Sequence, residues 1–177
     1  MQWAVSRPLS EDMIETEMSV AINGPAVTGG FELALACDFL YAAEGARFAD
    51  THARVGLLPG WGLSQKLGRL IGINRAREAS LTGNFIDAET AMTWGLVNKV
   101  CSPETLIENS LAAAQQIAES NPQTISAMRS LMNDGDLLSL GEALELEGAR
   151  GIAYLEHADF SQMENRLQAL KSRSKKS

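Results

Sequence analysis

Short apolar runs alternate with glycine-marked turns over residues 19–100, whereas beyond residue 101 the apolar residues recur at helical spacing. The run Ser19–Ile22 predicts a short buried strand that stops at the turn signal Asn23-Gly24-Pro25. Residues 29–37 are rich in alanine and leucine and apolar on nearly all sides, which is typical of a buried helix. Further strands are predicted at 38–43, 47–50 and 96–100.

Capping residues mark the ends of several helices. Asp87 is expected to cap a helix over 88–94, and Gly95 to end it in the left-handed conformation. The pairs Ser102-Pro103 and Asn121-Pro122 each place a cap before a proline at the first helical position, and Asp159 is expected to cap the last helix. Spacings of three and four predict apolar stripes at Ile107/Leu111/Ala114/Ala118, Leu140/Leu144/Gly148/Ile152 and Phe160/Met163/Leu167/Leu170.

The length of 177 residues suits one domain, and no linker or repeat divides it. We expect residues 1–18 to be an atypical N-terminal segment, 19–100 an α/β core and 101–177 a helical region. A hydrophobic fraction of 45% excludes an intrinsically disordered chain. The net charge of −7 argues against nucleic acid or an anionic membrane as a partner, because both require a basic surface.

A cytoplasmic location is predicted from three features. The amino terminus meets acidic residues before any hydrophobic stretch, so it does not look like a secretory signal. No apolar run approaches the roughly 20 residues that span a bilayer. Cys37 and Cys101 lack the spacing of zinc ligands and are expected to be reduced thiols.

The segment from Asn23 to Glu32 is the strongest candidate for chemistry. A strand leads into a tight loop, and Gly29 and Gly30 open the buried helix. Unpaired backbone N–H groups at a helix start can bind an anion or stabilise a developing oxyanion. Gly30-Phe31 stands where a phosphate loop needs Lys-Ser/Thr, and no G-x-G-x-x-G occurs, so an oxyanion site is favoured.

Two ionisable residues have both a structural and a functional interpretation. Glu32 lies in the first helical turn, where a carboxylate can satisfy backbone N–H groups or act as a general acid/base. His52 follows a strand-like stretch and can be a structural loop residue, or can return to the same pocket as Glu32. His157 lies between two predicted helices and is expected to be a connector.

Several of these segments together are similar to a known family. They are Ala21–Asp38 with its Gly-Gly-Phe-Glu, Ala46-Arg-Phe-Ala-Asp50, Gly56-Leu-Leu-Pro-Gly-Trp-Gly62, Leu81-Thr-Gly and Ala91–Asn98. The combination resembles the crotonase superfamily, the enoyl-CoA hydratase/isomerase proteins, over nearly nine-tenths of the chain. The resemblance implies an α/β fold: a spiral of ββα turns, incomplete at the N-terminus, with a C-terminal helical trimerisation region.

The resemblance also implies a substrate and a site. The substrate would be an acyl-CoA thioester, used without a metal or a redox cofactor, in a homotrimer or dimer of trimers. Gly29 would be one oxyanion donor, and Glu32 would be the first of the two glutamates that hold water in hydratases of the family. Substrate contacts are expected from Thr28, Gly30, Pro59, Gly60 and Trp61, although Trp61 has a simpler interpretation as a core aromatic.

This chain departs from the family's pattern at two points. His52 stands where the second glutamate would fall, and an imidazole there can orient water or exchange a proton near neutral pH. Residues 1–18 lack the Ala-Gly-x-Asp stretch that carries the other oxyanion donor in the family. Two hypotheses follow: a crotonase-type lyase or isomerase recorded as part of a longer product, or a catalytically impaired module that binds acyl-CoA or protein.

Overall fold

The computed structural model describes residues 19–173, and its contacts divide the chain into two compact units, residues 1–119 and 120–177. The single-domain organisation stays a prediction. Residues 1–18 lie outside the described range, so the interpretation of that segment is not addressed by the structure. None of the helices within residues 19–173 is long and apolar enough to cross a membrane.

The strands of the first unit alternate between two sheets. Within the described residues, one sheet runs in the order β1 (Ser19–Ile22), β3 (Phe39–Ala43) and β6 (Lys99–Cys101), with parallel neighbours. The other sheet runs in the order β2 (Pro25–Val27), β4 (Arg47–Ala49) and β5 (Ile86–Asp87), with β5 antiparallel to β4. Each pair of consecutive strands therefore contributes one strand to each sheet.

This alternation produces a spiral of ββα turns. The first turn is β1, β2 and α2 (Gly29–Ala36), and the next begins with β3, β4 and α3 (His52–Val55). Successive turns stack with β1 against β3 and β2 against β4, so that Val20 lies opposite Leu40 and Ala26 opposite Phe48. Parallel strands require a crossover connection, which α2 supplies. The spiral predicted from the sequence is confirmed.

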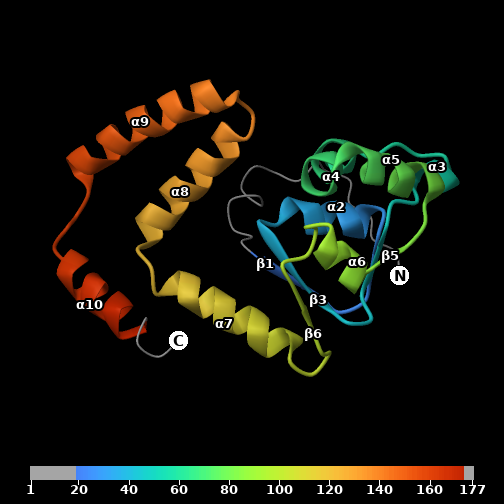
Figure 1. The fold of residues 1–177 in the computed structure, drawn as a ribbon, viewed down its shortest axis with the longest axis horizontal. Helices are drawn as coiled ribbons and strands as arrows, with labels where there is room; N and C mark the ends of the chain where they lie inside the picture. Colours follow the sequence, from blue (N-terminus) through green and yellow to red (C-terminus); the bar gives the residue numbers. More distant parts are fainter. Residues whose placement is uncertain (1–18, 174–177) are drawn as a thin grey trace. The chain divides into compact units, whose positions relative to one another are not determined.

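Helix α2 lies at the centre of the first unit, in contact with β2 on one side and with α4 (Leu63–Ile71) on the other (Figure 1). Its predicted burial is confirmed, because Phe31, Glu32, Ala34 and Leu35 are all buried. Phe31 packs against Phe48 of β4 with ring centroids 5.5 Å apart. Burial of these large side chains fixes α2, and with it the loop that precedes it.

Three further helices complete the first unit: α5 (Ile73–Thr82), α6 (Ala88–Thr93) and α7 (Leu106–Ala118). The predicted cap of α6 is confirmed, since Asp87 accepts a hydrogen bond from the Thr90 N–H and Gly95 has a φ of +84°. Helix α7 packs against β1, β3 and β6, and its Leu106 is fully buried. No disulfide joins Cys37 and Cys101, and their redox state stays a prediction.

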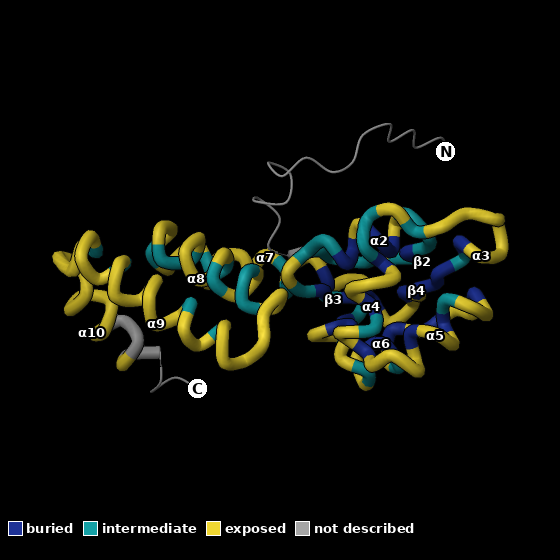
Figure 2. The backbone as a smooth tube through the Cα atoms, turned by 90° about the horizontal axis from the view of Figure 1, so that it is seen from above, coloured by how far each residue is buried: buried dark blue, intermediate teal, exposed yellow. Residues whose placement is uncertain are grey.

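The second unit consists of α8 (Pro122–Gly135), α9 (Leu140–His157) and α10 (Met163–Arg173). Asn121 caps α8 through the Thr124 N–H with Pro122 at the helix start, as predicted. Helices α8 and α9 pack together, joined by a 2.6 Å hydrogen bond between the Thr124 and Tyr154 hydroxyls. None of its side chains described by the structure is buried, in contrast to the first unit (Figure 2).

Three predicted element boundaries are wrong. The strand at 96–100 begins only at Lys99, because the Leu96 and Val97 N–H groups bond to Ala91 O as α6 ends. Helix α7 begins at Leu106 and not directly after Ser102. The Ser102 carbonyl oxygen accepts hydrogen bonds from the N–H groups of Thr105 and Leu106, in a turn that comes before the helix. Asp159 accepts from the Ser161 N–H, but α10 starts later, at Met163.

The predicted stripes do not form packing faces within this chain. In α7 the side chains at Ile107, Leu111, Ala114 and Ala118 are exposed. In α9 the predicted stripe is also exposed, with Leu140 at 76% of its full accessibility, and the helix faces α8 through other residues. In the last stripe Phe160, Met163 and Leu167 are exposed, and the side chain of Leu170 lies outside the described ones.

Candidate active site

The start of α2 is not covered by a side-chain cap. Thr28 is the residue that precedes the helix, and its hydroxyl lies 2.5 Å from the Thr51 hydroxyl and makes no bond to the helix itself. The carbonyl oxygen of Thr28 accepts the N–H groups of Phe31 and Glu32. The N–H groups of Gly29 and Gly30, in the first turn, have no acceptor within a helix and can donate to a ligand oxygen.

The Glu32 carboxylate is buried and directed away from its own helix start. Its Oε1 atom accepts a 2.7 Å hydrogen bond from the backbone N–H of Trp61, which belongs to the segment before α4. Its Oε2 atom lies 3.5 Å from Nε2 of His52. The interpretation of Glu32 as a cap for its own helix is therefore wrong, and the carboxylate faces other polar groups.

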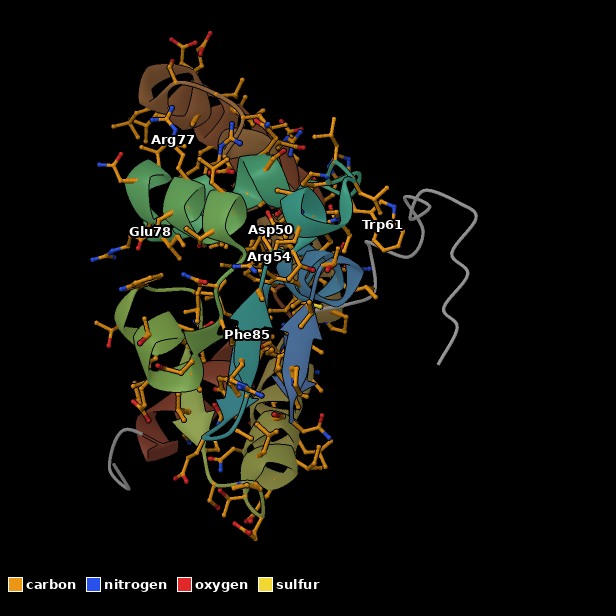
Figure 3. All side chains as sticks on the ribbon, turned by 90° about the vertical axis from the view of Figure 1, so that its right-hand side faces the viewer. Asp50, Arg54, Trp61, Arg77, Glu78 and Phe85 are labelled. Atoms are coloured by element: carbon orange, nitrogen blue, oxygen red, sulfur yellow. The ribbon has the colours of Figure 1, made fainter. Side chains whose placement is uncertain are left out.

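His52 returns to the same place as Glu32, as the spacing suggested. It is the first residue of α3, is buried, and lies between two carboxylates. Nδ1 is 2.7 Å from Oδ1 of Asp50, and Nε2 faces Glu32. Asp50 directly follows β4, at the junction of the strands with the helices α4 and α5 (Figure 3). The site thus places two acidic groups and one imidazole in a buried row.

Trp61 connects the acid/base pair to the helix start. Besides its N–H bond to Glu32, its indole ring would lie 3.5 Å from a Cβ atom added to Gly29. The ring is only half-buried, which fits a wall of an open site better than a core residue. Pro59 and Gly60 come directly before Trp61, and Gly30 is exposed. Their contacts with a substrate, and that of Thr28, stay predictions.

The sequence reasoning assigned no role to three residues near the site: Asp50, Thr51 and Arg54. Arg54 links α3 to the end of α5, because its Nε donates a 2.7 Å hydrogen bond to the carbonyl oxygen of Thr82. Asp50 accepts the backbone N–H of His52 at 3.2 Å, a common turn made by aspartate two residues before the donor. An aspartate at the end of an apolar strand, two residues before a histidine, is the signal that could have identified Asp50. His157 is exposed, but it is the last residue of α9 and does not lie between two helices as predicted.

Several known proteins are similar to this chain in sequence and fold. A profile of the family "Enoyl-CoA hydratase/isomerase" matches residues 10–171. The chain is 49% identical over 134 residues to "Probable enoyl-CoA hydratase 1, peroxisomal" of Arabidopsis thaliana, covering 76% of this chain and 51% of that protein. It is 42% identical over 135 residues to "Enoyl-CoA hydratase, mitochondrial" of Pongo abelii, covering 76% of this chain and 46% of that protein.

Solved structures agree with the fold. The crystal structure of enoyl-CoA hydratase from Bacillus anthracis matches with a TM-score of 0.81 and 34% identity, covering 92% of this chain and 63% of that one. The chain spans about half the length of the curated relatives it matches. The profile match, the relatives and the shared fold lead to one conclusion: this chain belongs to the enoyl-CoA hydratase/isomerase family, within the crotonase superfamily.

Proposed function

We propose that the chain acts on acyl-CoA thioesters by stabilising an enolate, and that its reaction is the hydration of a 2,3-enoyl-CoA. The observation that carries this proposal is the buried Glu32 carboxylate, which lies 3.5 Å from His52 Nε2 and accepts the N–H of Trp61, the residue whose ring lies next to Gly29 at the start of α2. A base, an acid and an oxyanion donor are the groups that this reaction requires.

The three groups have separate tasks in the proposed reaction. Glu32 takes a proton from water while the water oxygen bonds to C3, and the C2–C3 double-bond electrons move toward the thioester carbonyl. The Gly29 N–H donates to the resulting oxyanion. Protonated His52 then gives the proton on Nε2 to C2. Afterwards the proton on Glu32 returns to His52 across the 3.5 Å separation of Oε2 and Nε2, which restores both groups.

The test is an assay of crotonyl-CoA hydration by the 177-residue chain. The decrease in absorbance of the conjugated thioester measures the rate. Glu32→Gln keeps the size of the side chain but removes the base, and is expected to lower the rate by about 10²–10⁴-fold. Glu44→Gln makes the same change at an exposed position and is the matched control. Equal non-zero rates for wild type and Glu32→Gln would contradict the assignment of Glu32.

The second candidate is a binding module without turnover. It is favoured by His52, which stands where the family resemblance places the second glutamate, because an imidazole is not equivalent to a carboxylate in holding the attacking water. A chain that binds crotonyl-CoA by calorimetry but never hydrates it supports this candidate over the enzyme.

The remaining features belong to the same proposal. The reaction as drawn uses coenzyme A only as part of the substrate and needs neither a metal ion nor a redox cofactor. Assembly as a homotrimer or a dimer of trimers is proposed from the family and from the exposed apolar stripes of α7, α9 and α10. A cytoplasmic location stays a prediction, and the names of two relatives specify the peroxisome and the mitochondrion instead.

A further inference from the structure

Asp50 makes two contacts to one residue, His52. Its Oδ1 atom accepts the backbone N–H of His52 at 3.2 Å and lies 2.7 Å from the ring nitrogen Nδ1. Both side chains are buried. A single carboxylate oxygen therefore contacts the main chain and the ring of the same residue.

The chemistry of the two groups fixes where the ring proton must lie. An ionised carboxylate only accepts hydrogen bonds, so Nδ1 must carry a proton to make this 2.7 Å contact favourable. The other neutral tautomer would set a lone pair of Nδ1 against Oδ1 at 2.7 Å, whereas the Nδ1-protonated tautomer sets the lone pair of Nε2 against Glu32 Oε2 at the longer distance of 3.5 Å. The closer of these two buried contacts between acceptors is the more costly, because neither group can turn to water.

We infer that Asp50 is a positioning residue, which keeps the proton of His52 on Nδ1 and thereby presents Nε2 to Glu32. The titratable groups that the structure places against the ring are Asp50 on one side and Glu32 on the other. The consequence for catalysis rests on the proposed function, whereas the tautomer of His52 does not.

The tautomer can be measured directly in the full 177-residue chain. Long-range ¹H–¹⁵N correlation spectra of the ¹⁵N-labelled protein distinguish protonated from unprotonated imidazole nitrogens. Because the sequence holds only two histidines, His157→Gln assigns the signals of His52. The expected result at a pH where the ring is neutral is a protonated Nδ1 and an unprotonated Nε2. A proton on Nε2 would overturn the inference.

Variants identify which carboxylate is responsible. Asp50→Asn is expected to shift the population of His52 toward the Nε2-protonated tautomer, because the new amide group can donate to Nδ1. Glu32→Gln is expected to leave the Nδ1 proton in place, and Asp136→Asn, at an exposed carboxylate, is the matched control. An unchanged spectrum in Asp50→Asn would refute the role of Asp50. If that variant does not fold, the wild-type and Glu32→Gln spectra decide.

Kinetics separates the inference from the proposed function. In a chain that hydrates crotonyl-CoA, Asp50→Asn is expected to lower kcat by about 10²–10⁴-fold with little change in KM, because an amide donor facing Nδ1 disfavours a proton there, and the proposed step uses a ring with protons on both nitrogens. If Asp50→Asn has the same kcat and KM as the wild type, the inference is overturned. A chain that shows the predicted tautomer but no hydration contradicts the proposed function and leaves the positioning of His52 standing.

Discussion

Thr28 is the one non-glycine residue with positive φ within residues 19–173, at φ 53° and ψ −114°. A β-branched residue is a genuine outlier there, and such strain costs on the order of 1–3 kcal/mol. Its N–H donates to Ala49 O and its hydroxyl pairs with that of Thr51. Two contacts thus hold the start of α2 against the segment that carries Asp50 and His52, and the strain is located at the residue before Gly29, the proposed oxyanion donor.

Substitution of Thr28 by glycine and by alanine measures this strain. Both changes remove the hydroxyl, but only glycine relieves the backbone, so Thr28→Gly is expected to be about 1 kcal/mol more stable than Thr28→Ala. The free energy of unfolding in urea, followed by tryptophan fluorescence, gives the comparison. At Thr51, where φ is −100°, the order is expected to reverse, since glycine is normally the less stable residue. The same order at both positions would show that Thr28 is unstrained.

The residues of the site were predictable to different degrees. Glu32 and Gly29 carry a strong motif, and the twenty-residue spacing from Glu32 to His52 equals the offset between paired residues of β1 and β3. The direction of the Glu32 side chain was not predictable, because it depends on the Trp61 N–H, 29 residues further along the chain. Asp50 was overlooked since its role exists only through a neighbour at 2.7 Å.

At the scale of elements, capping residues located two helix starts and misplaced two others, because α7 and α10 begin four residues after the predicted caps Ser102 and Asp159. Asp87 and Asn121 begin helices as predicted because a side-chain acceptor satisfies a specific backbone donor. The spacing of apolar residues predicted that α7 and α9 are helices, but the faces it predicted to pack are exposed in this chain. Spacing alone cannot distinguish a face turned to the chain's own core from one left exposed. Pro25 was expected in a turn but is the first residue of β2. The first residue of a strand is a position that proline tolerates.

A cap that the sequence reasoning did not identify gives a pH-dependent prediction for α9. Ser139 and Glu142 form a reciprocal capping box, and the Ser139 hydroxyl and N–H lower the pKa of the Glu142 carboxyl below its ordinary 4.5. Because the folded-state pKa is depressed, the box stabilises α9 above pH 4.5 and this contribution is lost as the pH falls through the lowered value.

Titration of the Glu142 carboxyl by NMR checks this prediction. The wild-type carboxyl is expected to titrate below 4.5, and Ser139→Ala is expected to move its pKa back toward that value, because the main hydrogen bond is gone. The same variant is expected to lower the helicity measured by circular dichroism at neutral pH. Glu145→Gln, exposed on the same helix but outside the box, is the control for helicity. An unchanged Glu142 titration in Ser139→Ala would contradict the assignment.

At the scale of the whole molecule, the two units differ in what supports them. The first encloses Phe31, Phe48 and Leu63 completely, whereas no described side chain of the second is buried. Within the second unit, the contacts between α8 and α9 include a surface ion pair between Arg150 and Asp134 at 2.6 Å. Surface ion pairs contribute little, and ordering a helix is costly, so these helices need further apolar burial.

Self-association is therefore the last prediction, with the exposed stripes as the surface that becomes buried. Leu140 and Leu144 are 76% and 58% exposed on α9, and apolar clusters of this kind mark interaction sites. The 177-residue chain is expected to sediment as an oligomer, with trimers expected from the family, at micromolar concentration. Replacement of both leucines by glutamine removes two apolar side chains that the oligomer is expected to bury. This change is expected to weaken association by about 10²-fold or more.

The control replaces Glu145 and Glu147 by glutamine, two exposed positions on the same helix outside the apolar stripe, and is expected to leave the oligomer intact. This pair separates burial of the stripe from any general effect of changing α9. If the wild-type chain is a monomer at micromolar concentration, or if both double variants dissociate equally, the stripe is not an interface. The second unit would then have to gain its stability from the contacts within this chain alone, which leave its large apolar side chains exposed.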